Sequence, residues 1–140
     1  MQRSTPVQHL RSGGTSLVID FGAPGLPAVA YWGEDLGELS DDALDALVTA
    51  TLPQRVSGSI TLPARLSLVP QEAFGWQGTP ALTGSRRGRD FSPAFEVREI
   101  IQSPAQAGIE AADEEAGLAL AVTIEVDDAG LVRQQLTLTN

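Results

Sequence analysis

The chain has 140 residues, 42% of them hydrophobic and 19% charged, with no cysteine and one histidine. This composition is typical of one globular domain, and the lack of cysteine excludes disulfides, thiolate metal sites and cysteine nucleophiles. The formal net charge of −9 disfavours binding to nucleic acid or to an anionic membrane surface, because both carry negative charge themselves. No apolar run reaches the roughly 18 residues that span a bilayer and no signal sequence is visible, so we expect a cytoplasmic protein.

Alternating apolar residues near the N-terminus predict a β-hairpin within the first 33 residues. Leu17, Ile19 and Phe21 recur at every second position, which is typical of a half-buried strand. The segment 23–27 (APGLP) predicts a turn, and 28–32 (AVAYW) predicts the returning strand.

Residues 40–51 (SDDALDALVTAT) carry the one good helix signal of the sequence. Ser40 is a suitable N-cap, the two aspartates after it suit the positive end of the helix dipole, and Pro53 ends the pattern. The apolar stripe is narrow, so we expect a short helix on the surface. The stripe consists of Leu44, Leu47 and Val48.

The rest of the chain predicts strands around one irregular segment. Short edge strands are expected within 57–70, because Pro63 and Pro70 interrupt the pattern. Residues 71–93 contain glycine or proline too often for a long element. A β-meander is expected next, with strands over 94–101, 109–113, 118–126 and 131–139. The sequence therefore predicts a mainly β fold, an antiparallel β-sandwich with one short surface helix.

The residue types that most often carry catalysis do not form a recognisable set. His9 precedes the first predicted strand, and no Gly-x-Ser-x-Gly elbow accompanies it. The acidic residues at 113–115 and 127–128 fall in predicted turns, where solvated carboxylates are common. We therefore expect no catalytic residue, no metal and no cofactor in this chain.

The irregular segment 71–93 is the best candidate for a binding site, since long loops in compact domains are often functional. Trp76 has small neighbours that leave its indole exposed, and an aromatic face beside Arg and Asp suits stacking on a sugar ring and hydrogen bonding to its hydroxyls. The nearby charged residues are Arg86, Arg87, Arg89 and Asp90. A second interpretation stays open, in which Trp76, Phe91 and Phe95 fill the core and the arginines form salt bridges.

Five segments span nearly the whole chain: 9–20 (HLRSGGTSLVID), 31–37 (YWGEDLG), 69–80 (VPQEAFGWQGTP), 88–95 (GRDFSPAF) and 113–120 (DEEAGLAL). In this order they resemble the N-terminal domain of bacterial α-galactosidases (melibiases) of glycoside hydrolase family 36. The resemblance implies a β-supersandwich that precedes a (β/α)₈ barrel and a C-terminal β domain. It also implies hydrolysis of terminal α-galactosides such as melibiose and raffinose, with retention, by two barrel aspartates that have no counterpart here.

The resemblance thus implies that residues 1–140 are a single non-catalytic N-terminal domain, excerpted from a longer enzyme. Its implied partner is the catalytic barrel of the same chain. Family members are often tetramers in which this domain reaches toward a neighbour's active site, so a homo-oligomer and a loop that closes the sugar site are implied. The candidates for contact with the galactoside are Arg65, Trp76, Arg87 and Asp90. Trp32 is expected in the core or at a domain interface.

A function of another class remains as an alternative, a free-standing β-sandwich that binds carbohydrate or protein. The two hypotheses differ in the surface they predict. A domain of a larger enzyme exposes an apolar patch on one sheet face when the rest of the enzyme is missing. A free-standing module has a sealed surface and binds sugar by itself.

Overall fold

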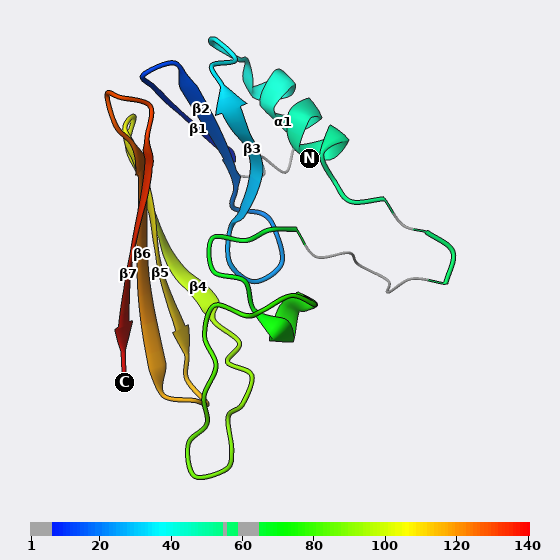
Figure 1. Cartoon of the computed structure of the whole chain (residues 1–140), viewed down its shortest axis with the longest axis vertical. Helices are drawn as coiled ribbons and strands as arrows, with labels where there is room; N and C mark the ends of the chain where they lie inside the picture. The colour runs from blue at the N-terminus through cyan, green and yellow to red at the C-terminus, as the bar shows by residue number, and fades with distance from the viewer. Residues whose placement is uncertain (1–6, 55, 59–64) are drawn as a thin grey trace.

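The structure is a computed structural model that describes residues 7–54, 56–58 and 65–140. These residues form two antiparallel sheets, with strand order β1-β2-β3 in one and β4-β5-β6-β7 in the other. Figure 1 shows the two sheets side by side, with the helix on the far side of the smaller one. The elements are β1 (Val7–Ser12), β2 (Thr15–Asp20), β3 (Ala28–Glu34), α1 (Asp41–Ala50), the 3₁₀ helix η1 (Glu72–Phe74), β4 (Glu96–Gln102), β5 (Gln106–Asp113), β6 (Leu118–Val126) and β7 (Val132–Thr139). The predicted β-sandwich with one surface helix is confirmed.

The smaller sheet contains one strand more than the predicted hairpin. β1 pairs with β2 through a two-residue turn, in which Gly13 and Gly14 have φ of 54° and 79°. Two positive φ angles in a two-residue loop define a type I′ turn, which suits glycine. The sequence of β1, VQHLRS, is mostly polar, and only Leu10 is buried. The hydrophobic pattern therefore did not reveal this strand.

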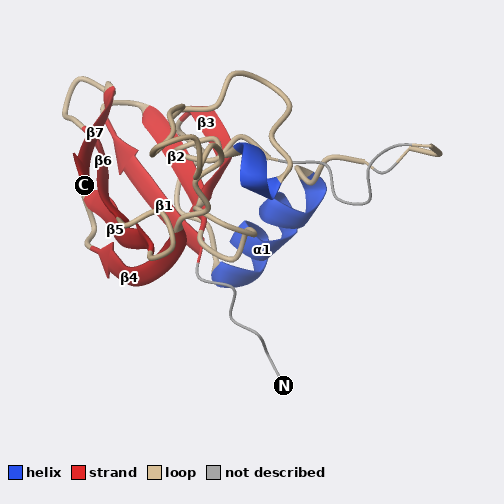
Figure 2. Ribbon diagram, turned by 90° about the horizontal axis from the view of Figure 1, so that it is seen from below, coloured by secondary structure: helices blue, strands red, loops and turns tan. Residues whose placement is uncertain are grey.

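The central strand β2 is covered on both faces. Leu17 and Ile19 belong to the core between the sheets, whereas Val18 packs with Leu44 and Val48 of α1. Figure 2 shows the resulting three layers, with the helix outside the smaller sheet. The alternation predicted for a half-buried strand is wrong here, because the surface helix buries the second face as well.

The larger sheet is the predicted meander, in which each strand pairs with the next along the chain. Even-numbered side chains of β6 face the core, where Leu120, Val122 and Ile124 are buried. β5 begins at Gln106, before the predicted start at residue 109. Its first residues include Ala107 and Gly108, which carry little strand signal.

The strand predicted near Pro70 does not form. Of this region, residues 59–64 lie outside the described part of the chain. Ser67 makes an isolated bridge with Ala28, supported by hydrogen bonds from the amides of Val29 and Leu68 to the carbonyls of Leu66 and Pro27. The segment 65–70 thus follows the start of β3 as a bend, which agrees with the two prolines that interrupt the pattern.

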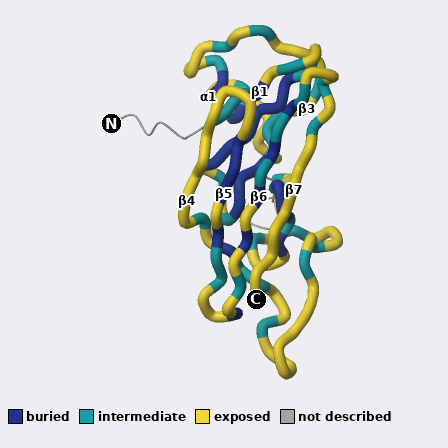
Figure 3. Tube along the Cα trace, turned by 90° about the vertical axis from the view of Figure 1, so that its left-hand side faces the viewer, coloured by how far each residue is buried: buried dark blue, intermediate teal, exposed yellow. Residues whose placement is uncertain are grey.

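One side of the sandwich is open. The smaller sheet lies over part of the larger one, because β1 contacts β5 and β6 and β2 contacts β6. The edge strands β3 and β7 therefore lie on the same side of the sandwich (Figure 2). Trp32 of β3 pairs with the buried Leu17 and shares its face, yet it is 65% exposed. Leu136 and Leu138 of β7 pair with the buried Val122 and Leu120, yet each is 46% exposed. In Figure 3 the trace of β7 is exposed over most of its length. We call Trp32, Leu136 and Leu138 the open edge.

Candidate functional site

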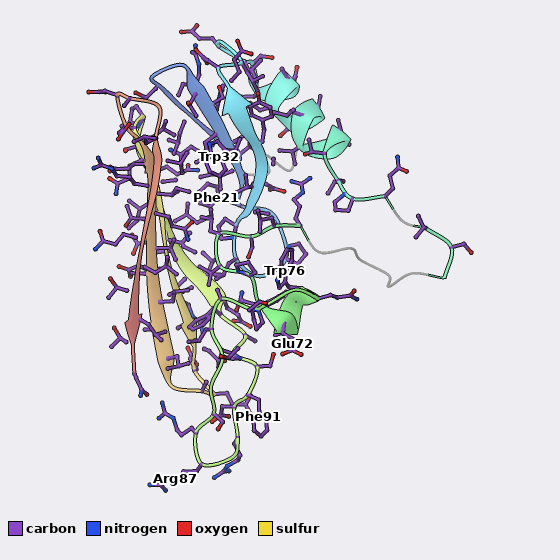
Figure 4. The ribbon with its side chains drawn as sticks, in the orientation of Figure 1. Phe21, Trp32, Glu72, Trp76, Arg87 and Phe91 are labelled. Atoms are coloured by element: carbon purple, nitrogen blue, oxygen red, sulfur yellow. The ribbon has the colours of Figure 1, made fainter. Side chains whose placement is uncertain are left out.

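A pocket of about 230 Å³ lies where the end of β2, the loop after it and the segment 65–76 meet. Its walls are mostly apolar and include Leu26, Phe74 and Trp76. Its polar lining includes Asp20, Arg65 and Gln71. Figure 4 shows Trp76 beside η1 at this place. We call it the aromatic pocket.

A buried ion pair forms one wall of the aromatic pocket. The Arg65 Nη1 lies 3.2 Å from the Asp20 Oδ2, and both side chains are at least nine-tenths buried. The Arg65 Nη2 also donates to the carbonyl of Val48 at 2.5 Å, while the amide of Gly22 donates to the Asp20 Oδ1 at 2.8 Å. The buried Arg65 Nε has no partner among the described residues. Burying two charges, and leaving the Nε–H without a hydrogen-bond acceptor, both cost free energy on folding. Stability alone therefore does not explain this pair.

Glycines hold the aromatic walls in place. The Trp76 Nε1 donates to the carbonyl of Thr79 at 3.1 Å, and a Cβ on Gly78 would lie 2.8 Å from that nitrogen. The Phe74 ring packs on Gly25, where an added Cβ would come within 2.7 Å of the ring. Side chains at either glycine would displace the rings, so the close backbone approach fixes where both aromatic walls lie.

Two of the predicted site residues lie on a hairpin away from the pocket. Arg86 and Arg89 exchange both backbone hydrogen bonds, at 2.8 and 3.0 Å, and enclose a tight turn at Arg87 and Gly88. Arg87 has φ of 52° and Asp90 has φ of 59°, a region that costs a non-glycine residue roughly 1–2 kcal/mol. Figure 4 shows Arg87 at the tip of this hairpin, remote from Trp76.

The four predicted contact residues therefore form two separate pairs. Arg65 and Trp76 both line the aromatic pocket, whereas Arg87 and Asp90 share the hairpin. The arginines predicted to surround Trp76 are not brought to it. Sequence reasoning also missed Asp20, because nothing in a strand-end aspartate signals a partner that lies 45 residues further along the chain.

The second interpretation of this segment is only partly right. Phe95 fills the core, but Phe91 is 66% exposed and Trp76 is half-buried. Among the described residues, carboxylates pair with Arg11, Arg65, Arg98 and Arg133. The three arginines of the hairpin, Arg86, Arg87 and Arg89, have no such ion pair there. Trp32 lies on the open edge, so its predicted place in the core is wrong, and the domain interface stays a prediction.

His9 belongs to a structural network that the sequence did not reveal. Its Nε2 lies 2.8 Å from the Ser16 Oγ, and that oxygen accepts a hydrogen bond from the amide of Leu36 at 2.9 Å. Arg11 binds both carboxylate oxygens of Asp35, at 2.6 and 2.9 Å. Burial, and secondly the nearby Arg11, lower the pKa of His9, and the Arg11 guanidinium holds the pKa of Asp35 well below its usual range. Ser16 is fully buried, so no substrate can reach its hydroxyl.

Two features are absent from the described residues. No group of three or more His, Asp or Glu side chains there is arranged to hold a metal ion. No helix in the same part of the chain is long and apolar enough to cross a bilayer.

Comparisons with known proteins agree on one family. Residues 25–140 match the family described as the glycosyl hydrolase family 36 N-terminal domain. An α-galactosidase of Escherichia coli is 26% identical over 112 residues, which make up 80% of this chain and 15% of that relative. The chain thus spans a small part of the length of the relative it matches. No solved structure matches the chain. Because the family match covers most of the sequence, the chain belongs to the family of glycosyl hydrolase family 36 N-terminal domains.

Proposed function

We propose that the chain is the non-catalytic N-terminal domain of an α-galactosidase that hydrolyses terminal α-galactosyl residues in oligosaccharides such as melibiose and raffinose. Family membership supports this assignment, as does the similarity to an α-galactosidase of which the chain covers only 15%. The hydrolytic carboxylates are then supplied by another part of a longer protein. The chain described here contributes packing surface and binding residues. A cytoplasmic location stays a prediction.

The open edge is the observation that carries this proposal. Trp32, Leu136 and Leu138 face the side of their sheets that is buried elsewhere in the sandwich, and yet each is about half exposed or more. Leu136 and Leu138 lie together on one face of β7, and exposed apolar side chains that adjoin each other mark an interaction site. We propose that the catalytic barrel of the same protein packs against the open edge.

The hairpin of Arg87 and Asp90 is proposed to reach a galactoside at an active site completed by another subunit of a homo-oligomer. Its strained backbone supports this role, because strain of this kind clusters where a side chain must be held for function. Its three arginines have no carboxylate partner among the described residues. The Arg86 guanidinium donates to the side-chain oxygen of Asn140, which leaves Arg87 and Arg89 to offer guanidinium donors to hydroxyls or carboxylates.

The assignment is tested by assaying a chromogenic α-galactoside with the 140-residue chain and with the longer protein of which it is proposed to be a part. We expect hydrolysis by the longer protein and none by the chain alone. Hydrolysis by the purified chain, or an inactive longer protein, contradicts the proposal.

The role of the hairpin is tested in the longer protein with Arg87→Ala. We expect KM to rise several-fold, and Arg133→Ala, an exposed arginine that pairs with Glu125 and Asp127, serves as the matched control. Equal kinetics for the two variants would remove the hairpin from the substrate site.

A further inference from the structure

We propose that the aromatic pocket is itself a binding site for one neutral sugar ring, such as the terminal hexose of an oligosaccharide. The inference rests on the proposed function in its choice of a carbohydrate. It adds a place on this chain where the sugar binds and the residues that hold it. Asp20, Arg65 and Gln71 supply the polar contacts, and Phe74 and Trp76 supply the apolar walls.

The stability of the fold does not require that the residues lining the aromatic pocket be polar. The buried polar residues of the described chain are Ser16, Asp20 and Gln71, and two of these three line the aromatic pocket. Arg65 joins them with a side chain that is nine-tenths buried and a guanidinium whose Nε is unpartnered among the described residues. Apolar residues of similar size would close this region at equal or lower cost. A concentration of buried polar groups around one hollow is the pattern of a ligand site.

The charges in this wall select a neutral ligand. Asp20 and Arg65 neutralise each other across 3.2 Å, so an ion that enters meets no net opposite charge. The Gln71 Oε1 accepts from the amide of Phe95 at 2.7 Å, while its amide nitrogen donates to no described residue. Hydroxyl groups match these partners, because each can donate to a carboxylate and accept from an amide or a guanidinium.

The apolar wall selects a ligand with an apolar face. The indole of Trp76 and the ring of Phe74 are fixed by Gly78 and Gly25, so they offer preformed surfaces that lose no conformational freedom on binding. The C–H face of a pyranose packs on such a ring. A volume of about 230 Å³ lies below the roughly 300–1,000 Å³ of pockets for drug-sized ligands, which favours one ring over a longer saccharide.

The test follows the two indole N–H signals of the ¹⁵N-labelled 140-residue chain by NMR, with Trp32→Phe to assign them. Galactose, raffinose and cyclohexanol are titrated in turn, the last as a ring of similar size with a single hydroxyl. We expect the Trp76 signal to shift and saturate at millimolar galactose and raffinose while the Trp32 signal stays still. Cyclohexanol is expected to shift it at least tenfold less at equal concentration.

A variant that fills the aromatic pocket distinguishes sugar binding in this pocket from binding elsewhere on the chain. Ala23 lines the pocket and is half-buried, so Ala23→Phe fills it, and Ala50→Phe on the exposed face of α1 is the matched control. We expect the Trp76 shift to be lost in the first variant and kept in the second. The proposal is overturned by no saturable shift, by a shift that survives Ala23→Phe, or by cyclohexanol binding as well as galactose.

These results are independent of the activity assay. An active longer protein whose isolated chain gives no Trp76 shift retains the proposed function and removes the pocket site. A saturable shift together with an inactive longer protein retains the pocket and contradicts the α-galactosidase assignment.

Discussion

The neighbouring strands β6 and β7 both place leucine or valine side chains on the inner face of the larger sheet, but these side chains differ in how far they are covered. Leu120 and Val122 of β6 are 5% and 1% exposed, whereas their partners on β7, Leu138 and Leu136, are each 46% exposed. The side chains are similar and adjacent, so the difference comes from the opposite layer. The opposite sheet has three strands, one fewer than the larger sheet, and its strands β1 and β2 contact β5 and β6.

This difference shows that apolar residues on one strand face need not serve one purpose. On β6 they make the core of the sandwich, and on β7 they form part of the open edge. The same contrast separates the buried ion pair of Arg65 from the exposed ion pairs on the meander. Substituting one buried and one exposed residue of the same type, and comparing the two losses of unfolding free energy, therefore tests whether burial makes the difference.

The largest difference is expected between two arginines. Arg65→Ala leaves the buried carboxylate of Asp20 without its partner, which should lower the free energy of unfolding by about 3–5 kcal/mol. Arg133→Ala breaks exposed pairs with Glu125 and Asp127 and should cost about 0–1 kcal/mol. Urea unfolding of both variants measures the difference, and equal losses would contradict the burial of the Arg65 pair.

The next comparison is between two leucines that face each other across β6 and β7. Leu120→Ala should lower the free energy of unfolding by about 2–5 kcal/mol, because it opens a cavity in the core. Leu138→Ala removes a half-exposed side chain and should cost about 1 kcal/mol or less. Thermal or urea unfolding distinguishes the two, and a Leu138 loss as large as that of Leu120 would mean that β7 is already covered.

The helix that covers the outer face of β2 gives a smaller effect. The Ser40 hydroxyl accepts from the amide of Ala43 at 3.3 Å, so Ser40→Ala should cost about 0.5–2 kcal/mol of stability. Ser85→Ala, on an exposed loop, is the control and should change stability by less than about 0.5 kcal/mol. An unchanged unfolding curve for Ser40→Ala would show that α1 does not depend on this cap.

The smallest effect is the pH dependence that His9 contributes. Its pKa in the folded chain lies below the usual value of 6.5, so the unfolded chain binds the proton more readily. Stability from this group is full above pH 6.5 and falls as the pH drops through the folded pKa. Urea unfolding between pH 7.5 and 5 should show this loss, and His9→Gln should flatten that part of the profile. If stability instead rose on acidification and His9→Gln abolished that rise, the lowered pKa of His9 would be contradicted.

The larger sheet could be predicted from the sequence, because the alternation in 118–126 and the turn at 127–130 are local signals. β1 could not, since its polar residues are needed for the network of His9 and its partners and carry no hydrophobic period. The same limit applies to the aromatic pocket. Trp76 and Arg65 could be chosen by residue type, but the contact with Asp20 depends on how distant segments fold together.

If further polypeptide covers the open edge, it should slow hydrogen–deuterium exchange of the backbone amides there. Uptake over β7 and over the segment around Trp32 is compared between the 140-residue chain and the longer protein, with β5 as the internal reference. We predict slower exchange at both edge segments in the longer protein and unchanged exchange in β5. Equal uptake at the edge in the two proteins, or a reading frame that stops after Asn140, would contradict the account.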